Sequence, residues 1–474
     1  MPLFKLPVAT PKPEKPDVPK EKKQDITIRC ILFFDGTLNN RQNITERKNY
    51  ESGQGSKAYL ENRKNPNKEL RIAQGAQGID LKEDSYENDF SNIATLEQNI
   101  EKNQSGYNES LKVYTEGAGT EDFEKDKGAG FAFAAGSTGV KAKVAKGIDK
   151  AVKLISKGPT GDRKPETIII KKLTIDIFGF SRGAASARYC VYQLLQDEQT
   201  SIRKRLTDAW FDVEIVEVRF VGLFDTVSAY YGTQLIKILP LEDWLVKLEA
   251  VRLAEKVLHL ASAEEHRYHF SLHNIKSAGS KGKEYFLPGT HSDVGGGYLD
   301  NGSDAGLIVF QGTPSQSIDD RRKYLVTNGW YQEAQLVEEV LSYNSETGDT
   351  DRVNLTVSRE TPRRNVRNAY CKIPLKIMAT AAGENGIKVM PDLENDATAI
   401  IDDAGLSAFE SRITADFKKA GAQSSPKPWQ KADPELNALR HQHLHFSARY
   451  NTFFGHNPRR LFFSNKRERY EFDG

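Results

Sequence analysis

Apolar runs alternate with amphipathic stretches along the first 300 residues of the chain. The runs are rich in β-branched and aromatic residues and predict strands at 25–34, 110–115, 165–178, 213–224 and 283–287. Several of these runs are apolar at consecutive positions, which is typical of strands covered on both faces. The pattern therefore predicts a mostly parallel α/β sheet with helices on both sides.

Helical spacing separates the predicted strands. We expect helices at 90–100, 140–155, 184–195 and 244–270, the last a long one, and a further helix at 331–343. Residues 40–89 are polar over a length that is unusual for a connection, so an inserted or long loop is predicted there. The chain is accordingly divided into an arm at 1–26, a catalytic domain at 27–326 and a helical, cap-like region at 327–474, which could be integrated with the catalytic domain.

Composition narrows the class of protein. The 474 residues carry a formal charge of +2, and 38% of them are hydrophobic, as in a globular protein with no electrostatic bias toward nucleic acid. The three cysteines lie far apart, which argues against a disulfide framework and a thiolate metal site. The Pro/Lys-rich start contains no apolar core of a signal peptide, and no window is apolar enough to cross a bilayer. We expect synthesis in the cytoplasm without classical secretion, and a disordered N-terminal arm.

The stretch ILFFDGTLNN, at 31–40, resembles the Asp-x-Asp-Gly-Thr signature of aspartate phosphatases. Phe33 stands where the nucleophilic carboxylate of such enzymes would be, and a phenyl ring cannot attack phosphorus. A phosphatase is therefore disfavoured, and Asp35 is interpreted as an organiser of the loop that follows the first strand.

The sequence Gly179-Phe180-Ser181-Arg182-Gly183 is a GxSxG motif between a predicted strand and a predicted helix. This is the setting of a nucleophile elbow, in which flanking glycines permit a tight turn that exposes the serine hydroxyl. The fold class predicted is thus α/β-hydrolase-like, with Ser181 as nucleophile. An ordinary helix-capping serine remains the alternative.

A serine nucleophile needs a base and an orienting acid, which in such sheets follow later strands in the order Ser, Asp, His. Asp225, in FVGLFDTV, and His291, in PGTHSDVGGGY, both come after predicted strands. Asp293 competes for the role of the acid, although a turn-forming or supporting role is the simpler interpretation.

An oxyanion hole in this architecture takes one amide from the residue after the nucleophile and one from an early loop. We expect Arg182 to supply the first, and Gly36 or Thr37 the second.

No cofactor or metal is required for this chemistry. His441, His443 and His445 alternate in LRHQHLHF, but a structural role is favoured over a metal site, and His259 is interpreted as a packing residue. Phe131 and Phe133, in a Gly-rich segment, are candidates for an apolar flap beside the cleft.

With these residues in view, the chain resembles the type VI secretion lipase effectors, phospholipases with an α/β-hydrolase domain. The resemblance depends on FFDGTLNN, FSNIATL, GFSRGAASAR, FVGLFDTV, AEEHRYHF and PGTHSDVGGGY, in that order over about residues 28 to 300. It departs from the family at Phe34 and Phe224, where members often carry Trp or Tyr.

The resemblance implies a phospholipase A acting on membrane glycerophospholipids, with Ser181, Asp225 and His291 as its triad. It further implies delivery by a secretion machine to the periplasm or membrane of a target cell, docking on a secretion spike protein, and neutralisation by an immunity protein. A non-lipase serine hydrolase and a catalytically silent binding or adaptor protein with the same fold are the alternatives.

Overall fold

The computed structural model describes most of the chain. The described residues are 23–55, 57–64, 85–127, 138–159, 161, 163–228, 247–267, 270–303, 310–312, 316–346, 352–391, 393, 404–431, 433–448 and 469–474. Phe131 and Phe133, and with them the expected flap, lie outside these residues, as does nearly all of the N-terminal arm.

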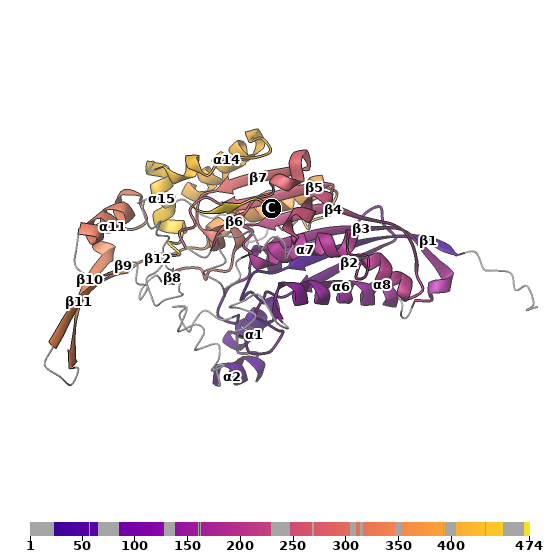
Figure 1. The fold of residues 1–474 in the computed structure, drawn as a ribbon, viewed down its shortest axis with the longest axis horizontal. Coiled ribbons are helices and arrows are strands. Elements are labelled where there is room, and N and C mark those ends of the chain that lie inside the picture. The colour runs from indigo at the N-terminus through magenta and orange to yellow at the C-terminus, as the bar shows by residue number, and fades with distance from the viewer. Residues whose placement is uncertain are drawn as a thin grey trace, which may run out of the picture.

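A six-stranded sheet forms the centre of the molecule (Figure 1). Its strands lie in the order β2 (Glu109–Thr115), β1 (Gln24–Phe34), β3 (Ile168–Phe180), β4 (Asp212–Phe224), β5 (Lys256–Ser262) and β7 (Gly282–Leu287). Every neighbouring pair is parallel. The predicted α/β class with a parallel sheet is confirmed, and the carboxyl ends of all six strands meet at one edge, where ligands bind in such folds.

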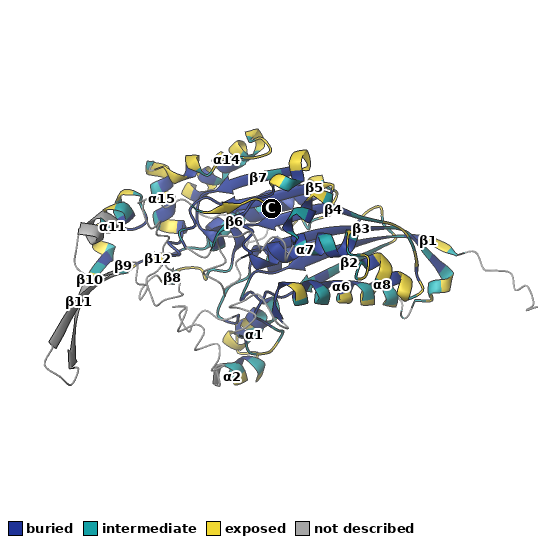
Figure 2. Cartoon of the chain, viewed as in Figure 1, coloured by how far each residue is buried: buried dark blue, intermediate teal, exposed yellow. Residues whose placement is uncertain are grey.

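The two faces of the sheet bury different side chains because successive residues of a strand point to opposite sides. In β1, Cys30, Leu32 and Phe34 face one core, while Ile31 and Phe33 face the other. The first core is covered by α6 (Val140–Lys157), α7 (Arg182–Leu195) and α8 (Ile202–Asp208). Figure 2 shows the strands buried between layers of helices whose outer surfaces are exposed.

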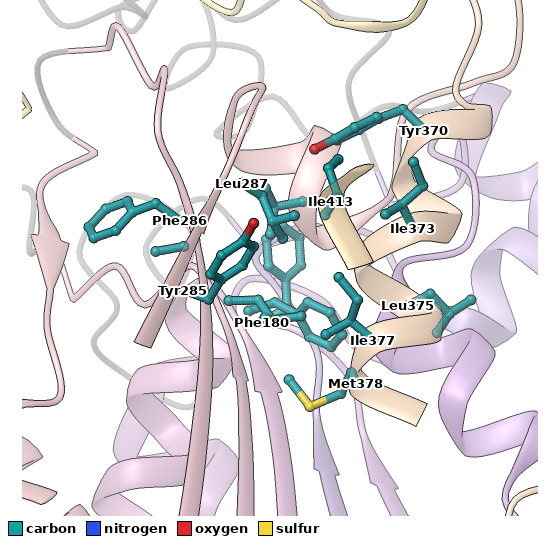
Figure 3. Packing of buried hydrophobic residues seen from close by; sticks show 14 of the residues in the cluster. Phe180, Tyr285, Phe286, Leu287, Tyr370, Ile373, Leu375, Ile377, Met378 and Ile413 are labelled. Carbon is teal, nitrogen blue, oxygen red and sulfur yellow. The ribbon is translucent and has the colours of Figure 1, made fainter. Parts of the chain in front are cut away.

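The second core joins the sheet to the C-terminal part of the chain. Its helices are α4 (Asn92–Asn99), α12 (Lys372–Glu384), α14 (Ala404–Lys419) and α15 (Pro434–His443). Figure 3 shows Phe180 of β3 and Tyr285 of β7 close to Ile377 and Met378 of α12 and Ile413 of α14. Residues beyond 326 thus share a hydrophobic core with the sheet, although the boundaries of the three predicted regions stay predictions.

The expected long helix at 244–270 is wrong in the part that the structure describes. A short 3-10 helix, Leu248–Leu253, is followed by β5, whose Val257, Leu258, Leu260 and Ala261 are all buried. A strand buried on both faces has apolar residues at consecutive positions, and such a run cannot be told from a buried helix by its periodicity. The segment is a strand because it pairs with β4 and β7.

The helix expected at 331–343 is also wrong. Residues Leu336–Glu346 form β10, which pairs antiparallel with β11 (Arg352–Pro362), and β11 pairs with β9 (Phe310–Gly312). The alternating sequence of β11 favours a strand, and pairing with it overrides the helical spacing of β10. The hairpin extends away from the main sheet (Figure 1).

The remaining elements are short. In its described part, the polar stretch expected to be an insertion contains the helices α1 (Arg41–Glu51) and α2 (Lys57–Lys64). The others are α10 (His291–Gly295), α11 (Gln316–Thr327), and the strand pairs β8 (Gly302–Ser303) with β12 (Asn365–Val366) and β13 (Glu471–Phe472) with β6 (Leu272–His273). None of the helices in the described ranges is long and apolar enough to cross a membrane.

Candidate active site

Ser181 occupies a strained turn between β3, which ends at Phe180, and α7, which begins at Arg182. Its backbone has φ 58° and ψ −125°, a conformation that non-glycine residues rarely adopt. Hydrogen bonds to β4 and to the loop after it help to hold the turn: Ser181 N donates to Phe224 O at 3.0 Å, and Val227 N donates to Ser181 O at 3.3 Å. Such strain persists only where the surroundings fix it, and it is common at catalytic sites. The strand, turn and helix of a nucleophile elbow are therefore all present.

The two glycines of the GxSxG motif are required by close contacts of the backbone. A Cβ on Gly179 would lie 2.4 Å from the carbonyl oxygen of Gly183, and a Cβ on Gly183 would lie 2.2 Å from the carbonyl oxygen of Phe34. Real Cβ atoms do not approach so closely. Glycine at both positions allows the start of α7 to lie against the ends of β1 and β3.

Asp225 and His291, predicted from separate segments, lie in direct contact. Asp225 follows β4 with a positive φ of 43°, and His291 begins the short helix α10 rather than lying in a loop. The distance between His291 Nδ1 and Asp225 Oδ2 is 2.5 Å, and both side chains are almost completely buried. A bond to a carboxylate places the proton of a neutral imidazole on Nδ1, so the Nε2 atom is left able to accept a proton.

Ser181 lies next to this pair without a hydrogen bond to it. The ring of Phe180, the preceding residue, contacts the His291 ring with 4.7 Å between centroids. Ser181 N is bonded to Phe224, the residue before Asp225. No hydrogen bond joins Ser181 Oγ to the His291 ring among the described residues. Catalytic hydrogen bonds are often formed only when substrate is bound, so this geometry is compatible with a serine and its base.

The pKa values of both members of the pair are lowered, for different reasons. Burial raises the pKa of Asp225, but the Arg469 guanidinium and the His291 ring together hold that pKa well below its usual range. Burial, assisted by Arg267, lowers the pKa of His291 even though Asp225 and Glu265 favour its charged form. The carboxylate is therefore ionised and the imidazole neutral near neutral pH, as a general base and its orienting acid require.

The expected oxyanion amides are only partly available. Gly36 N donates to Asp35 Oδ1 at 2.7 Å, so this amide is already engaged. Thr37 remains, and its Oγ1 accepts a hydrogen bond from Arg182 Nε, which joins the two candidate amide-bearing residues. Gly36 itself is required by packing, because a Cβ there would lie 2.5 Å from the Phe180 ring.

Asp35 has the contacts of a loop organiser. Its Oδ1 accepts hydrogen bonds from Gly36 N and from Ser91 Oγ at 2.6 Å, and its Oδ2 accepts one from Tyr114 Oη at 2.6 Å. Burial raises the pKa of Asp35 to about 6, against the hydrogen bonds, which favour the ionised form. Asp35 thereby ties the loop after β1 to α4 and β2.

Asp293 supports the helix that carries His291 and does not contact its ring nitrogens in the described part of the chain. Thr290 N and Thr290 Oγ1 donate to Asp293 Oδ2 at 2.8 and 3.0 Å and form the N-terminal cap of α10. The other oxygen, Oδ1, pairs with His445 Nδ1 at 2.7 Å. Asp293 and His445 thus fix the position of α10.

Three residues at the site were missed or misread from the sequence. Arg469 donates to both oxygens of Asp225 at 2.6 and 2.9 Å. Glu265 accepts a hydrogen bond from His291 N at 3.1 Å. His259, interpreted as a packing residue, accepts one from Thr226 N at 3.0 Å while its Nδ1 pairs with Glu284. Only Glu265 lies in a quoted motif, AEEHRYHF; a lone arginine 244 positions from its partner gives no signal.

The alternating histidines do not share one role. His441 and His443 are in the last turn of α15, whereas His445 lies beyond it against Asp293. Within the described ranges, no group of three or more histidine, cysteine or carboxylate side chains is arranged to hold a metal ion.

Comparison with a known sequence family covers Asp225 and His291 but not Ser181. Residues 191–314, which include Asp225 and His291, match the sequence family described as the catalytic domain of Tle1-like phospholipase effectors of the type VI secretion system. The resemblance to these effectors is confirmed. A search of curated protein sequences finds no match.

Solved structures match the chain, and one of them supports the fold. The chain is similar to the Tle1 effector solved in complex with the VgrG spike of the type VI secretion system, with 24% identity, 91% of this chain and 86% of that chain covered, and a TM-score of 0.57. It also matches an uncharacterised protein from Pseudomonas aeruginosa at 18% identity, over 88% of this chain and 53% of that chain, with a TM-score of 0.41. The Tle1 likeness supports the fold.

Proposed function

We propose that this Tle1-like chain is a serine esterase of the phospholipase A type, with Ser181 as nucleophile, His291 as base and Asp225 as orienting acid. The observation that carries the proposal is the buried His291–Asp225 pair, 2.5 Å apart, beside a serine held at an elbow of positive φ. The match of residues 191–314 to a phospholipase effector family supports the reaction class.

The chemistry follows from the positions of the atoms. His291 Nε2 takes the proton of Ser181 Oγ as that oxygen bonds to the ester carbonyl carbon, and the carbonyl oxygen becomes negative. Amides at Arg182 N and Thr37 N are the donors for this oxyanion. The protonated imidazole then gives its proton to the departing alcohol, which leaves as lysophospholipid. Water, activated by the same nitrogen, cleaves the acyl–Ser181 ester and releases the fatty acid.

The same proposal includes the route of the enzyme. A relative of this fold was solved bound to a secretion spike, which supports docking of this chain on such a spike for delivery. The substrate is the membrane of the target cell, reached in its periplasm, and the producing cell needs an immunity protein. Apolar surface around the cleft would admit the lipid, with Phe131 and Phe133 as the flap.

The decisive experiment compares wild type with Ser181→Ala for fatty-acid release from vesicles of phosphatidylethanolamine and phosphatidylglycerol. Ser186→Ala is a matched control, since Ser186 is a buried serine one turn along α7 whose Oγ donates only to Arg182 O at 3.0 Å. We expect release by wild type and Ser186→Ala and none by Ser181→Ala. Equal release by wild type and Ser181→Ala would overturn the assignment.

Labelling by a fluorophosphonate probe separates the alternatives. A non-lipase serine hydrolase would be labelled at Ser181 yet release no fatty acid from vesicles. A silent binding protein would show neither labelling nor release.

A further inference from the structure

The last described residues, 469–474, are packed beside the candidate triad; we call them the C-terminal strap. Within it, β13 pairs in parallel with β6, and Leu272 N donates to Tyr470 O at 2.8 Å while Asn274 N donates to Phe472 O at 2.9 Å. Lys276 and Asp473 form an ion pair at 2.7 Å. The chain end is marked beside β5 and β6 in Figure 1. The strap is therefore held by backbone and side-chain bonds independent of the triad.

Arg469, the first residue of the strap, forms a fork on Asp225. Its Nη1 lies 2.6 Å from Oδ1 and its Nη2 2.9 Å from Oδ2. Two further contacts hold the guanidinium, because Nε donates to Phe270 O at 2.7 Å and Nη1 donates to Ser262 Oγ at 2.9 Å. The Arg469 side chain is 5% exposed, and that of Asp225 is fully buried. A two-pronged contact of this kind fixes the plane of a carboxylate as well as neutralising its charge.

Asp225 Oδ1 also accepts hydrogen bonds from uncharged donors. Ser262 N and Ser262 Oγ donate to Oδ1 at 2.8 and 3.1 Å, and Oδ2 is left to Arg469 Nη2 and the His291 ring. Arg469 is thus the group, other than His291 itself, that holds Oδ2. Its loss would leave the oxygen facing His291 without a second restraint.

The charges that face His291 come from four segments. Asp225 lies at the end of β4, Glu265 and Arg267 follow β5, and Arg469 comes from the strap. On α10 itself, Asp293 is engaged by Thr290 and His445. Each of the two carboxylates nearest to the ring is paired with its own guanidinium, Glu265 with Arg267 and Asp225 with Arg469. The two negative charges nearest to the imidazole are therefore each neutralised by an arginine.

We infer that Arg469 is a positioning residue of the hydrolase: it aims the Asp225 carboxylate at His291 and limits the basicity of the imidazole. The inference rests on the proposed function, since it assigns to Asp225 and His291 their roles in the triad. A fork that holds both oxygens keeps the acid oriented, and its positive charge reduces the attraction of a proton to His291. The proton acceptor thus stays neutral to lower pH than it would beside an unpaired aspartate.

The test is a pH profile of the variants Arg469→Gln and Arg469→Lys, from about pH 5 to about pH 9. The readouts are kcat and KM for a soluble short-chain ester and the rate of fluorophosphonate labelling at Ser181. For Arg469→Gln we expect the acid limb of kcat/KM to move up by about one pH unit and kcat to fall about tenfold, with KM unchanged. For Arg469→Lys, which keeps the charge and loses the fork, we expect the limb at its wild-type position and a reduced kcat.

Arg203→Gln serves as the control, because Arg203 is an exposed arginine whose hydrogen bonds within the described part of the chain go to Val213 O and Glu214 O. Its profile should equal that of wild type. A residue with only a structural role would lower activity without moving the limb, so an unmoved limb in Arg469→Gln overturns the inference. If Arg469→Gln does not fold, Arg469→Lys decides: a wild-type kcat in that variant overturns the role of the fork.

Failure of the inference differs from failure of the proposed function. If wild type is labelled and Ser181→Ala is not, the triad proposal stands, and a wild-type profile for Arg469→Gln defeats the role of Arg469 alone. If wild type is not labelled at Ser181 at any pH, the triad proposal fails and the inference fails with it.

Discussion

Gly183 lies directly against the backbone of Asp35: a Cβ at Gly183 would be 2.3 Å from the Asp35 carbonyl oxygen and 2.2 Å from that of Phe34. The backbones of the first turn of α7 and of the loop after β1 are therefore in close contact at Gly183. A side-chain hydrogen bond from Arg182 Nε to Thr37 Oγ1 joins the same two segments. The two conspicuous motifs of the sequence, FFDGT and GFSRG, thus form one structural unit.

Gly183→Ala should disrupt this unit. The added methyl group would meet backbone atoms that cannot move aside, so we expect a loss of about 1–3 kcal/mol in the free energy of unfolding and a large drop in kcat. Urea unfolding and ester hydrolysis measure the two effects. Gly383→Ala is the control, since a Cβ at Gly383 of α12 would have no described atom within 4 Å apart from its chain neighbours and its own helix backbone, and there we expect no loss. Wild-type stability and activity in Gly183→Ala would contradict the requirement for close contact.

Asp225→Asn and Asp293→Asn should have different effects. Asn at 225 cannot hold His291 in the correct tautomer and leaves Arg469 unpaired, so kcat should fall by about 10⁴-fold. Asn at 293 weakens the cap of α10, and we expect a loss of about 1 kcal/mol in the free energy of unfolding with less than about a tenfold loss of kcat. Hydrolysis and urea unfolding of both variants provide the comparison. The larger catalytic loss in Asp293→Asn would make Asp293 the acid.

The pH dependence of wild type should reflect the lowered pKa of His291. Burial and Arg267 disfavour the imidazolium, and a base whose pKa is lowered keeps its neutral form to more acidic pH. The acid limb of kcat/KM should therefore have its midpoint below the ordinary histidine value of about 6.5. Steady-state hydrolysis of a soluble ester across this range measures it. A midpoint above that value would mean that Asp225 and Glu265 outweigh burial.

Much of the fold is predictable from the sequence because a parallel sheet needs consecutive apolar residues, which β1, β3 and β4 have. The same feature misleads at β5, where consecutive apolar residues were interpreted as helix. β10 shows the other limit, because its spacing is helical and only its pairing with β11 makes it a strand. A local sequence pattern does not predict which distant segments pair as strands.

The residues of the candidate site were also only partly predictable from the sequence. Ser181, Asp225 and His291 were predicted because each follows a strand in a characteristic motif, and the structure brings Asp225 and His291 into contact. Arg469 could not be predicted, since its position depends on a strap that pairs with β6 across the chain. The hydrogen bond from Gly36 N to Asp35 Oδ1 could not be predicted either, because it depends on one side-chain torsion.

Asp35→Asn tests both the stability of the loop and the phosphatase alternative. Burial raises the pKa of Asp35 to about 6 in the folded protein, against about 3.9 in an unfolded chain. The folded state therefore binds the proton more tightly, and the stability that this group contributes is complete below about pH 4 and is lost as pH rises through about 6. Asn cannot titrate, so the free energy of unfolding of Asp35→Asn, relative to wild type, should increase between about pH 4 and pH 7. Urea unfolding at both pH values, with Asp208→Asn at an exposed carboxylate as control, measures the difference.

The same variant tests the phosphatase alternative. Esterase activity should survive in Asp35→Asn, because the oxygen of Asn still accepts the hydrogen bond from Gly36 N. If wild type releases phosphate and Asp35→Asn does not, the phosphatase assignment is restored.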